Sequence, residues 1–199
     1  MVTRPNQLLD AVINAGLRSR VEGDYAAARK QFEEALRLDP TSAEAHRYLG
    51  QTLSYQAADV VEDPRAKEAA LDEAEKMVRQ AEALQGGESP DSLHDMAWIE
   101  DERGRYETAI ALYRKARDQA RREAREENIG FTYNLVCALA KFGALDDALE
   151  ELSSVINEAW KWAERDPDLE NLRNSPVTSQ RLQRLISEAK SAFTKKSNE

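Results

Sequence analysis

Apolar residues recur along the chain at intervals of three and four, the spacing that places them on one face of an α-helix. The first such stretch covers residues 6–21 and is followed by Gly23; the second covers residues 25–38 and is followed by Pro40. Glycine and proline commonly mark helix ends. The pattern therefore predicts a pair of amphipathic helices joined by a short turn.

Small and aromatic residues stand at fixed places within this pair. Gly16 lies in the first helix, Ala28, Phe32 and Ala35 lie in the second, and Pro40 follows. Small side chains at Gly16 and Ala28 would let the two backbones approach, and Phe32 would fill the gap beside that contact. This order resembles the tetratricopeptide repeat (TPR), whose second helix carries alanine and phenylalanine at these intervals before a proline. The resemblance implies an all-α fold, a right-handed solenoid of helical hairpins.

Four imperfect copies of the pair can be traced, followed by a segment that closes the array. The expected repeats cover residues 9–42, 43–89, 90–128 and 129–163, and the capping segment covers residues 164–193. In the second copy, the second helix lies 46 residues after its counterpart, from Ala28 to Ala74. A plain repeat has 34 residues. We therefore expect an insertion at residues 57–67, with Pro64 opening the helix that follows.

Two helix ends can be predicted in the remaining copies. No helix breaker stands between Tyr106 and Gly130, so the second helix of the third copy is expected to continue to about Glu127. Ser175 and Pro176 have the types favoured at a helix N-cap and at the first helical residue, which predicts the start of the capping helix. Together the copies predict a single TPR-like domain over residues 1–199.

Charge argues against nucleic acid as a partner. Lys and Arg number 28 against 37 Asp and Glu, so the net charge is −9, and such a chain repels phosphate. The most basic stretch runs from Arg114 to Arg125, but Asp118 and Glu123 are interleaved with its arginines. We interpret it as a solvated helix face with ion pairs along the helix.

The sequence contains no recognisable catalytic or metal-binding pattern. His46 and His94 are the only histidines, and neither has a strong ligand at helical spacing. Cys137 is the only cysteine and lies among apolar residues, which raise a thiol pKa. We therefore predict a protein without enzymatic activity, metal or cofactor. No stretch is apolar enough for a membrane span or a signal peptide, and a cytoplasmic location is expected.

The family resemblance also implies where a partner would bind. In TPR arrays, the first helix of each repeat lines a concave groove. The matching positions in this chain are Arg47, Gln51, Tyr55, His94, Trp98, Asp101, Tyr133, Cys137 and Lys141. Tyrosine and tryptophan are typical anchors of interfaces. The alternative is that Trp98 or Tyr133 packs between neighbouring helices.

Chaperone-binding members of the family hold a peptide carboxylate with lysine and asparagine residues on successive first helices. The corresponding positions here hold Ile13, Leu17, Tyr48, Asp91 and Asp95. The two aspartates would repel a carboxylate, so we expect a protein or peptide partner that is basic or apolar. Two further hypotheses remain open. One is self-association or a place in a larger assembly through the first helix and Val60-Val61, and the other is an enzyme or small-molecule sensor around His94.

Overall fold

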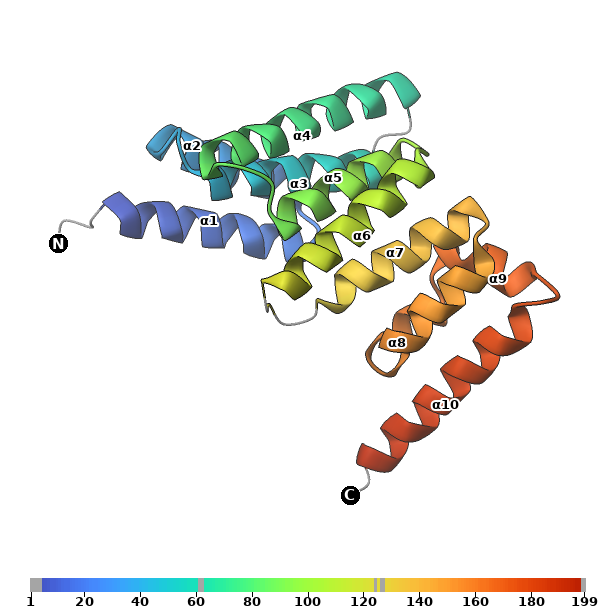
Figure 1. The fold of residues 1–199 in the computed structure, drawn as a ribbon. Helices are drawn as coiled ribbons and strands as arrows, with labels where there is room; N and C mark the ends of the chain where they lie inside the picture. Colours follow the sequence, from blue (N-terminus) through green and yellow to red (C-terminus); the bar gives the residue numbers. More distant parts are fainter. Residues whose placement is uncertain (1–4, 61–62, 124, 126–127, 198–199) are drawn as a thin grey trace. The chain divides into compact units, whose positions relative to one another are not determined.

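The computed structural model describes residues 5–60, 63–123, 125 and 128–197, and every regular element among them is a helix (Figure 1). The first five α-helices are α1 (Pro5–Val21), α2 (Tyr25–Leu38), α3 (Ala43–Val60), α4 (Pro64–Gln85) and α5 (Pro90–Glu102). They are followed by α6 (Tyr106–Arg122), α7 (Ile129–Phe142), α8 (Leu145–Ala163), the short 3-10 helix η1 (Pro167–Leu169), α9 (Glu170–Asn174) and α10 (Ser179–Ser197).

These helices form two compact units, divided between Arg103 and Gly104. Unit 1 holds α1 to α5, and unit 2 holds α6 to α10. The division lies between the two helices of the expected third repeat, at a turn where Gly104 takes a φ of 73°. The repeat boundaries and the single domain over residues 1–199 stay predictions.

Close backbone contacts in unit 1 explain the small residues of the first two repeats. A Cβ atom added at Gly16 would lie 2.7 Å from the ring of Phe32, which is fully buried. The second repeat builds the same contact with other residues: a Cβ at Gly50 would lie 2.9 Å from the carbonyl oxygen of Ala74 and from a methyl of Val78. The predicted packing of α1 against α2 therefore recurs between α3 and α4.

The expected insertion lengthens helices rather than forming a separate loop. Within residues 57–67, residues 57–60 continue α3 and residues 64–67 open α4, which has 22 residues against 14 in α2. Pro64 is the first residue of α4, as predicted, and the Asp63 carboxylate accepts a hydrogen bond from the backbone N–H of Arg65. Residues 61–62 lie outside the described part.

Unit 2 is built around α7, which packs against α6 and α8. Its core contains Tyr113, Leu135, Leu139 and Leu152, each at most 2% exposed. The end of the chain covers α8, because α10 packs against α8 and α9.

Two predicted helix ends in unit 2 are wrong. α6 ends at Arg122 rather than near Glu127, which itself lies outside the described residues. Glu123 caps that end through its backbone N–H, so the helix stops without a glycine or proline. Ser175 is not the N-cap of α10, which begins four residues later at Ser179. Ser175 instead opens a turn in which the buried Thr178 hydroxyl donates to the carbonyl of Leu172 at 2.9 Å.

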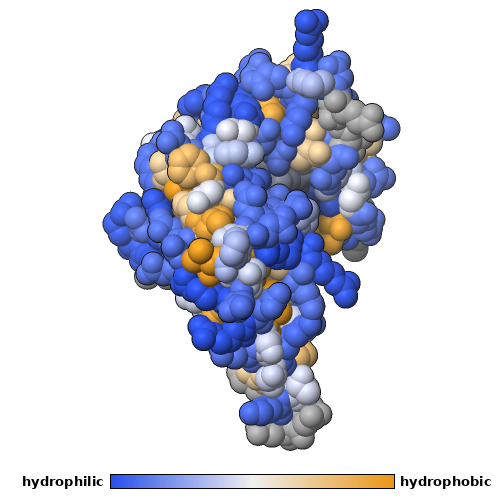
Figure 2. Space-filling model, turned by 90° about the vertical axis from the view of Figure 1, so that its right-hand side faces the viewer, coloured by the Kyte–Doolittle hydropathy of each residue, from blue (hydrophilic) through white to orange (hydrophobic). Residues whose placement is uncertain are grey.

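Ion pairs and exposed polar residues dominate the surface. The face drawn in Figure 2 is largely hydrophilic, with apolar residues gathered in small patches. Two arginines of α6 pair with the next helix: Arg114 lies 3.4 Å from Asp147 and Arg117 lies 2.5 Å from Glu151, both on α8. Arg117 also lies 3.8 Å from Asp118 of its own helix, so carboxylates of α6 and α8 both pair with the arginines of this stretch.

Candidate partner-binding face

The first helices of the expected repeats in unit 1 are neighbours, since α3 contacts both α1 and α5. Arg47, Gln51 and Tyr55 follow one another at helical spacing on α3, so they share one side of that helix. Trp98 lies on the facing part of α5, where its ring contacts Tyr55. We call this surface the α1–α3–α5 face and define it by Arg20, Arg47, Gln51, Tyr55, Asp95 and Trp98.

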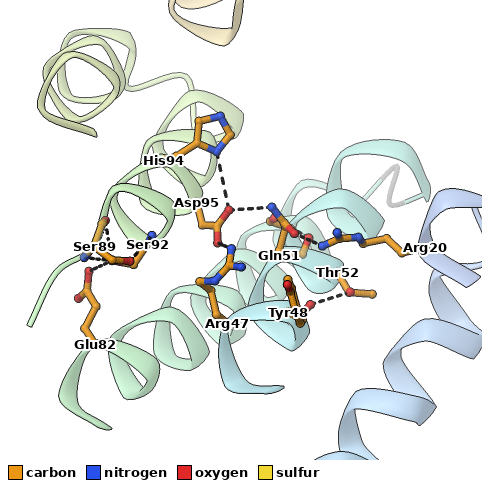
Figure 3. Close-up of polar contacts among 11 residues, drawn as sticks. Arg20, Arg47, Tyr48, Gln51, Thr52, Glu82, Ser89, Ser92, His94 and Asp95 are labelled. Atoms are coloured by element: carbon orange, nitrogen blue, oxygen red, sulfur yellow. Dashed lines mark hydrogen bonds and ion pairs between the residues drawn. The ribbon is translucent and has the colours of Figure 1, made fainter. Parts of the chain in front are cut away.

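A continuous chain of polar contacts crosses this face (Figure 3). Arg47 Nη1 lies 3.0 Å from Asp95 Oδ2, and Gln51 Nε2 donates to Asp95 Oδ1 at 2.8 Å. Because the amide nitrogen of Gln51 points to Asp95, its oxygen is turned toward α1, where it accepts a hydrogen bond from Arg20 Nη1. The chain therefore ties together three helices that are distant in sequence.

An aromatic cluster lies beside this polar chain. The rings of Tyr55 and Trp98 meet edge to face, with centroids 5.2 Å apart and an interplanar angle of 90°. The ring centroid of Tyr25, the first residue of α2, lies 6.3 Å from that of Tyr55, and the Tyr25 hydroxyl donates to Asp59 at 2.8 Å. All three rings are half-buried, so each also presents surface to the outside. The indole Nε1 of Trp98 is buried and has no hydrogen-bond partner among the described residues.

Burial and neighbouring charges set the ionisation of this face. Burial raises the pKa of Tyr55, and the charge of Asp95 adds to the shift, so the phenol stays neutral. Burial acts to lower the pKa of Arg47, but the nearby Asp95 and Asp91 outweigh it and the pKa is raised. Arg20 differs: burial lowers its pKa, and the charge of Asp95 only partly opposes that effect.

Asp95 does not act as the exposed anion that the sequence suggested. It is 3% exposed, and both of its oxygens are engaged by Arg47 and Gln51. Its charge is therefore largely balanced inside the unit, which weakens the argument for a basic partner. His94 and Asp101, also expected in the groove, are 7% and 4% exposed, and His94 Nδ1 lies 3.8 Å from Asp95 Oδ1.

The three groove positions expected in unit 2 converge on a turn of their own chain. Tyr133 donates to Asp166 Oδ2 at 3.0 Å, Cys137 Sγ lies 3.8 Å from the same oxygen, and Lys141 Nζ lies 3.3 Å from Asp168. Tyr133 also packs edge to face on Trp162, with centroids 5.3 Å apart. Burial raises the pKa of Tyr133, and its neighbours Cys137 and Asp166 reinforce the shift. Tyr133 is 5% exposed and packs inside unit 2.

Cys137, Asp166 and Asp168 could offer a metal three ligand atoms, all within 4.8 Å of one another. The contacts of these groups argue against that use. Lys141 already lies against Asp168, and the Tyr133 hydroxyl donates to Asp166. A cation would have to displace or compete with both. We interpret the group as the polar contact that holds the turn on α7.

Sequence reasoning missed Arg20 and Tyr25. Both lie near the turn between α1 and α2, where a charged or polar residue suggests a solvated helix end. Their partners, Gln51 and Asp59, are 31 and 34 residues away, and no local pattern indicates them. The separation of 34 residues between Tyr25 and Asp59 is a weak signal of their contact, because residues one repeat length apart lie in neighbouring hairpins.

Comparison with known proteins agrees with this architecture. Residues 16–56, which include Gly16, Phe32 and Gly50, match the family model described as TPR repeat. Residues 16–56 therefore carry a TPR repeat. No curated protein matches it.

Solved structures with the same fold have low sequence identity to this chain. Pseudomonas aeruginosa PilF matches with a TM-score of 0.65 and 19% identity, over 93% of this chain and 78% of PilF. TPR-like repeats of a putative kinesin light chain from Podospora anserina match with a TM-score of 0.64 and 17% identity, over 98% and 99% of the two chains. These likenesses confirm the all-α helical-repeat fold.

An enzyme is also among the similar structures. A mutant O-GlcNAc transferase from Thermobaculum terrenum matches with a TM-score of 0.61 and 18% identity, over 78% of this chain. This chain spans only 27% of that enzyme, and the likeness is one of fold. Within the described part of the chain, no helix is long and apolar enough to cross a membrane.

Proposed function

We propose that this TPR protein is an interaction scaffold without catalytic activity, and that its α1–α3–α5 face binds a segment of a partner protein. The aromatic cluster of Tyr25, Tyr55 and Trp98 carries the proposal. Three half-buried rings from three helices are held in fixed relative positions, which lowers the entropy that binding costs. Aromatic side chains of this kind dominate interface energies.

Of the two partner chemistries expected, the structure favours the apolar one. The acidic character that would attract a basic segment is reduced at Asp95, which Arg47 and Gln51 hold. The rings of Tyr55 and Trp98 offer apolar surface beside hydrogen-bonding groups. A partner segment with an apolar or aromatic anchor fits this combination.

The other functions that the sequence allowed receive less support. The self-association hypothesis uses apolar residues of the first helix together with Val60-Val61. Of these, Ile13 is 4% exposed and packs inside unit 1, whereas Leu17 is half-buried. The Val60 side chain and Val61 lie outside the described part. An enzyme or sensor centred on His94 would need that side chain to be accessible, and His94 is 7% exposed. A cytoplasmic location stays a prediction.

Purified proteins can test the proposal. Partners are first captured from the native cell on the full chain, and a captured partner is then purified and titrated against it. We expect Tyr55→Ala to weaken binding at least tenfold, because a central aromatic anchor typically contributes about 2 kcal/mol or more. Trp98→Phe is expected to weaken binding less than Trp98→Ala, because it keeps most of the ring surface.

Leu84→Ala is the matched control. Leu84 lies on α4 of the same unit, is 36% exposed and does not belong to the α1–α3–α5 face. It is expected to leave affinity unchanged. Equal affinity of the wild type, Tyr55→Ala and Trp98→Ala, with the fold intact by circular dichroism, would show that the partner binds elsewhere.

A further inference from the structure

Arg20 is a half-buried cation for which the described residues provide no carboxylate at ion-pair distance. Its guanidinium donates to the neutral amide oxygen of Gln51 and lies over two tyrosine rings, 5.4 Å from the centre of Tyr48 and 6.0 Å from that of Tyr55. A guanidinium has five N–H donors. One hydrogen bond to a neutral oxygen therefore leaves most of its donors and its whole charge without a direct partner in unit 1.

The neighbouring charges do not balance Arg20 either. Asp95 is the carboxylate that acts on it, and that carboxylate is already paired with Arg47 at 3.0 Å. Asp91 adds a second negative charge near Arg47, whereas Asp95 is the carboxylate that acts on Arg20, so the positive charge at the α1 end of the polar chain has no carboxylate of its own. Burial lowers the pKa of Arg20, the direction expected when a cation loses water and gains too little in return.

The Arg20 guanidinium is also held in a fixed position. Gln51 fixes the guanidinium, Asp95 fixes Gln51, and Arg47 fixes Asp95, so the free donors of Arg20 are held beside the aromatic cluster (Figure 3). Arg20 lies one turn beyond Leu17, so it is not at a position where chaperone-binding relatives place their carboxylate-binding residues. A planar fork held in this way suits bidentate contact with a carboxylate.

We infer that Arg20 is the anion-recognition point of the α1–α3–α5 face, and that the partner segment presents a carboxylate to it next to an apolar anchor on Tyr55. This inference rests on the proposed function and specifies its partner chemistry. An acidic group flanked by apolar or aromatic residues fits both halves of the surface. A basic segment does not, because it would approach an unbalanced arginine.

Random short peptides displayed on phage test this chemistry without a known partner. The full chain, Arg20→Gln and Arg18→Gln are used separately for selection at physiological ionic strength. Arg18 lies two residues away on α1 and is exposed, so its loss removes the same charge from a neighbouring position. We expect the wild type and Arg18→Gln to enrich peptides with aspartate or glutamate beside apolar residues. Arg20→Gln is expected to lose the acidic preference.

A double-mutant cycle makes the test quantitative. A selected peptide and its version with the acidic side chain changed to the amide are titrated against the wild type and Arg20→Gln. The acidic group is expected to improve affinity about tenfold or more on the wild type and not on Arg20→Gln. Arg20→Lys, which keeps the charge and loses the fork, is expected to retain part of the preference and serves if Arg20→Gln does not fold.

The outcomes separate this inference from the proposed function. The role of Arg20 would be overturned if Arg20→Gln still selects acidic peptides, or if the wild type selects peptides without acidic residues. If those peptides still lose affinity with Tyr55→Ala, the face binds partners and only the anion site is wrong. If no peptide is enriched on any of the proteins, the result counts against both.

Discussion

Gly50 has no side chain, and its small size permits the close contact between α3 and α4. Gly50 faces the backbone carbonyl of Ala74, and a Cβ there would lie 2.9 Å from that oxygen. A backbone carbonyl cannot rotate away as the end of a side chain can, so the two helices would have to separate to make room for the added methyl group. The same requirement explains why the family pattern places a small residue in the first helix of a repeat.

We expect Gly50→Ala to destabilise unit 1 by about 1–3 kcal/mol, the usual cost of overpacking a core. Alanine is the better helix former by about 1 kcal/mol, and this gain opposes the clash without cancelling it. Urea unfolding followed by circular dichroism measures the difference. An increase in stability would show that helix propensity dominates and that the helices are not in close contact at Gly50.

Gly16→Ala offers a second test, because its obstacle is a side chain. The added Cβ would lie 2.7 Å from the Phe32 ring edge. The change is expected to destabilise the wild type, whereas in a Phe32→Leu background, where the ring is absent, it is expected to cost less. Equal costs in both backgrounds would contradict the contact.

The sequence predicted such core residues better than the residues of the site. Gly16, Ala28 and Phe32 show a local spacing that reports their packing, because both helices of a hairpin are close in sequence. Arg20 depends on Gln51 and Asp95, which lie 31 and 75 residues further along the chain. Only the packing of α1, α3 and α5 brings these three together, so local periodicity could not identify the group.

At the scale of elements, one arginine joins the end of α5 to α4. The side chain of Arg103 is 3% exposed and contacts Glu68, Asp72 and Glu75 of α4 at 3.1, 2.6 and 2.7 Å, and Glu100 of α5 at 2.8 Å. Although burial acts to lower the pKa of Arg103, the hydrogen bonds that Arg103 donates to Glu75 and Glu100 raise it. The cation therefore balances several carboxylates that would otherwise repel one another.

We expect Arg103→Gln to destabilise the protein by about 1–3 kcal/mol at neutral pH, because charge-assisted hydrogen bonds are lost and the carboxylates remain. Burial acts to raise the pKa of Glu75, but Arg103 and Arg79 lower it below its ordinary value of 4.5. A carboxyl with a lowered pKa stabilises the fold above its ordinary pKa, and this contribution disappears as the pH falls through the lowered value. The difference between wild type and variant should therefore shrink in acid.

Unfolding midpoints at neutral pH and at about pH 3 measure this effect. Arg79→Gln is the control, since Arg79 also pairs with Glu75 but its side chain is 62% exposed. Its cost should be within about 0.5 kcal/mol. A constant difference between wild type and Arg103→Gln over this pH range would mean that the arginine acts through packing of its stem and not through the carboxylates.

The sequence predicted where helices form, but it predicted two helix ends wrongly. The overlong α6 was predicted because no glycine or proline interrupts residues 106–129, yet the helix ends at Arg122. Ser175 has the side chain of an N-cap, but Thr178 anchors the turn and delays α10. In both cases hydrogen bonds between residues two to six positions apart accompany the boundary, and a propensity scale does not include them.

At the scale of the whole molecule, charge decides which classes of partner are accessible. The chain carries a net charge of −9, and the most basic helix, α6, has carboxylates of α8 against it. Arg114 and Arg117 are therefore held by Asp147 and Glu151 within unit 2. Phosphate groups would have to displace these carboxylates and approach an acidic protein at the same time.

We therefore expect no retardation of single-stranded or duplex oligonucleotides in gel electrophoresis at physiological ionic strength. Asp147→Asn combined with Glu151→Gln removes two negative charges and releases the two arginines. This variant is expected to bind oligonucleotides weakly and only at low salt, because phosphate binding depends on counterion release. Retardation by the wild type at physiological salt that disappears in Arg117→Gln would contradict the argument, since α6 would then bind phosphate despite its carboxylate partners.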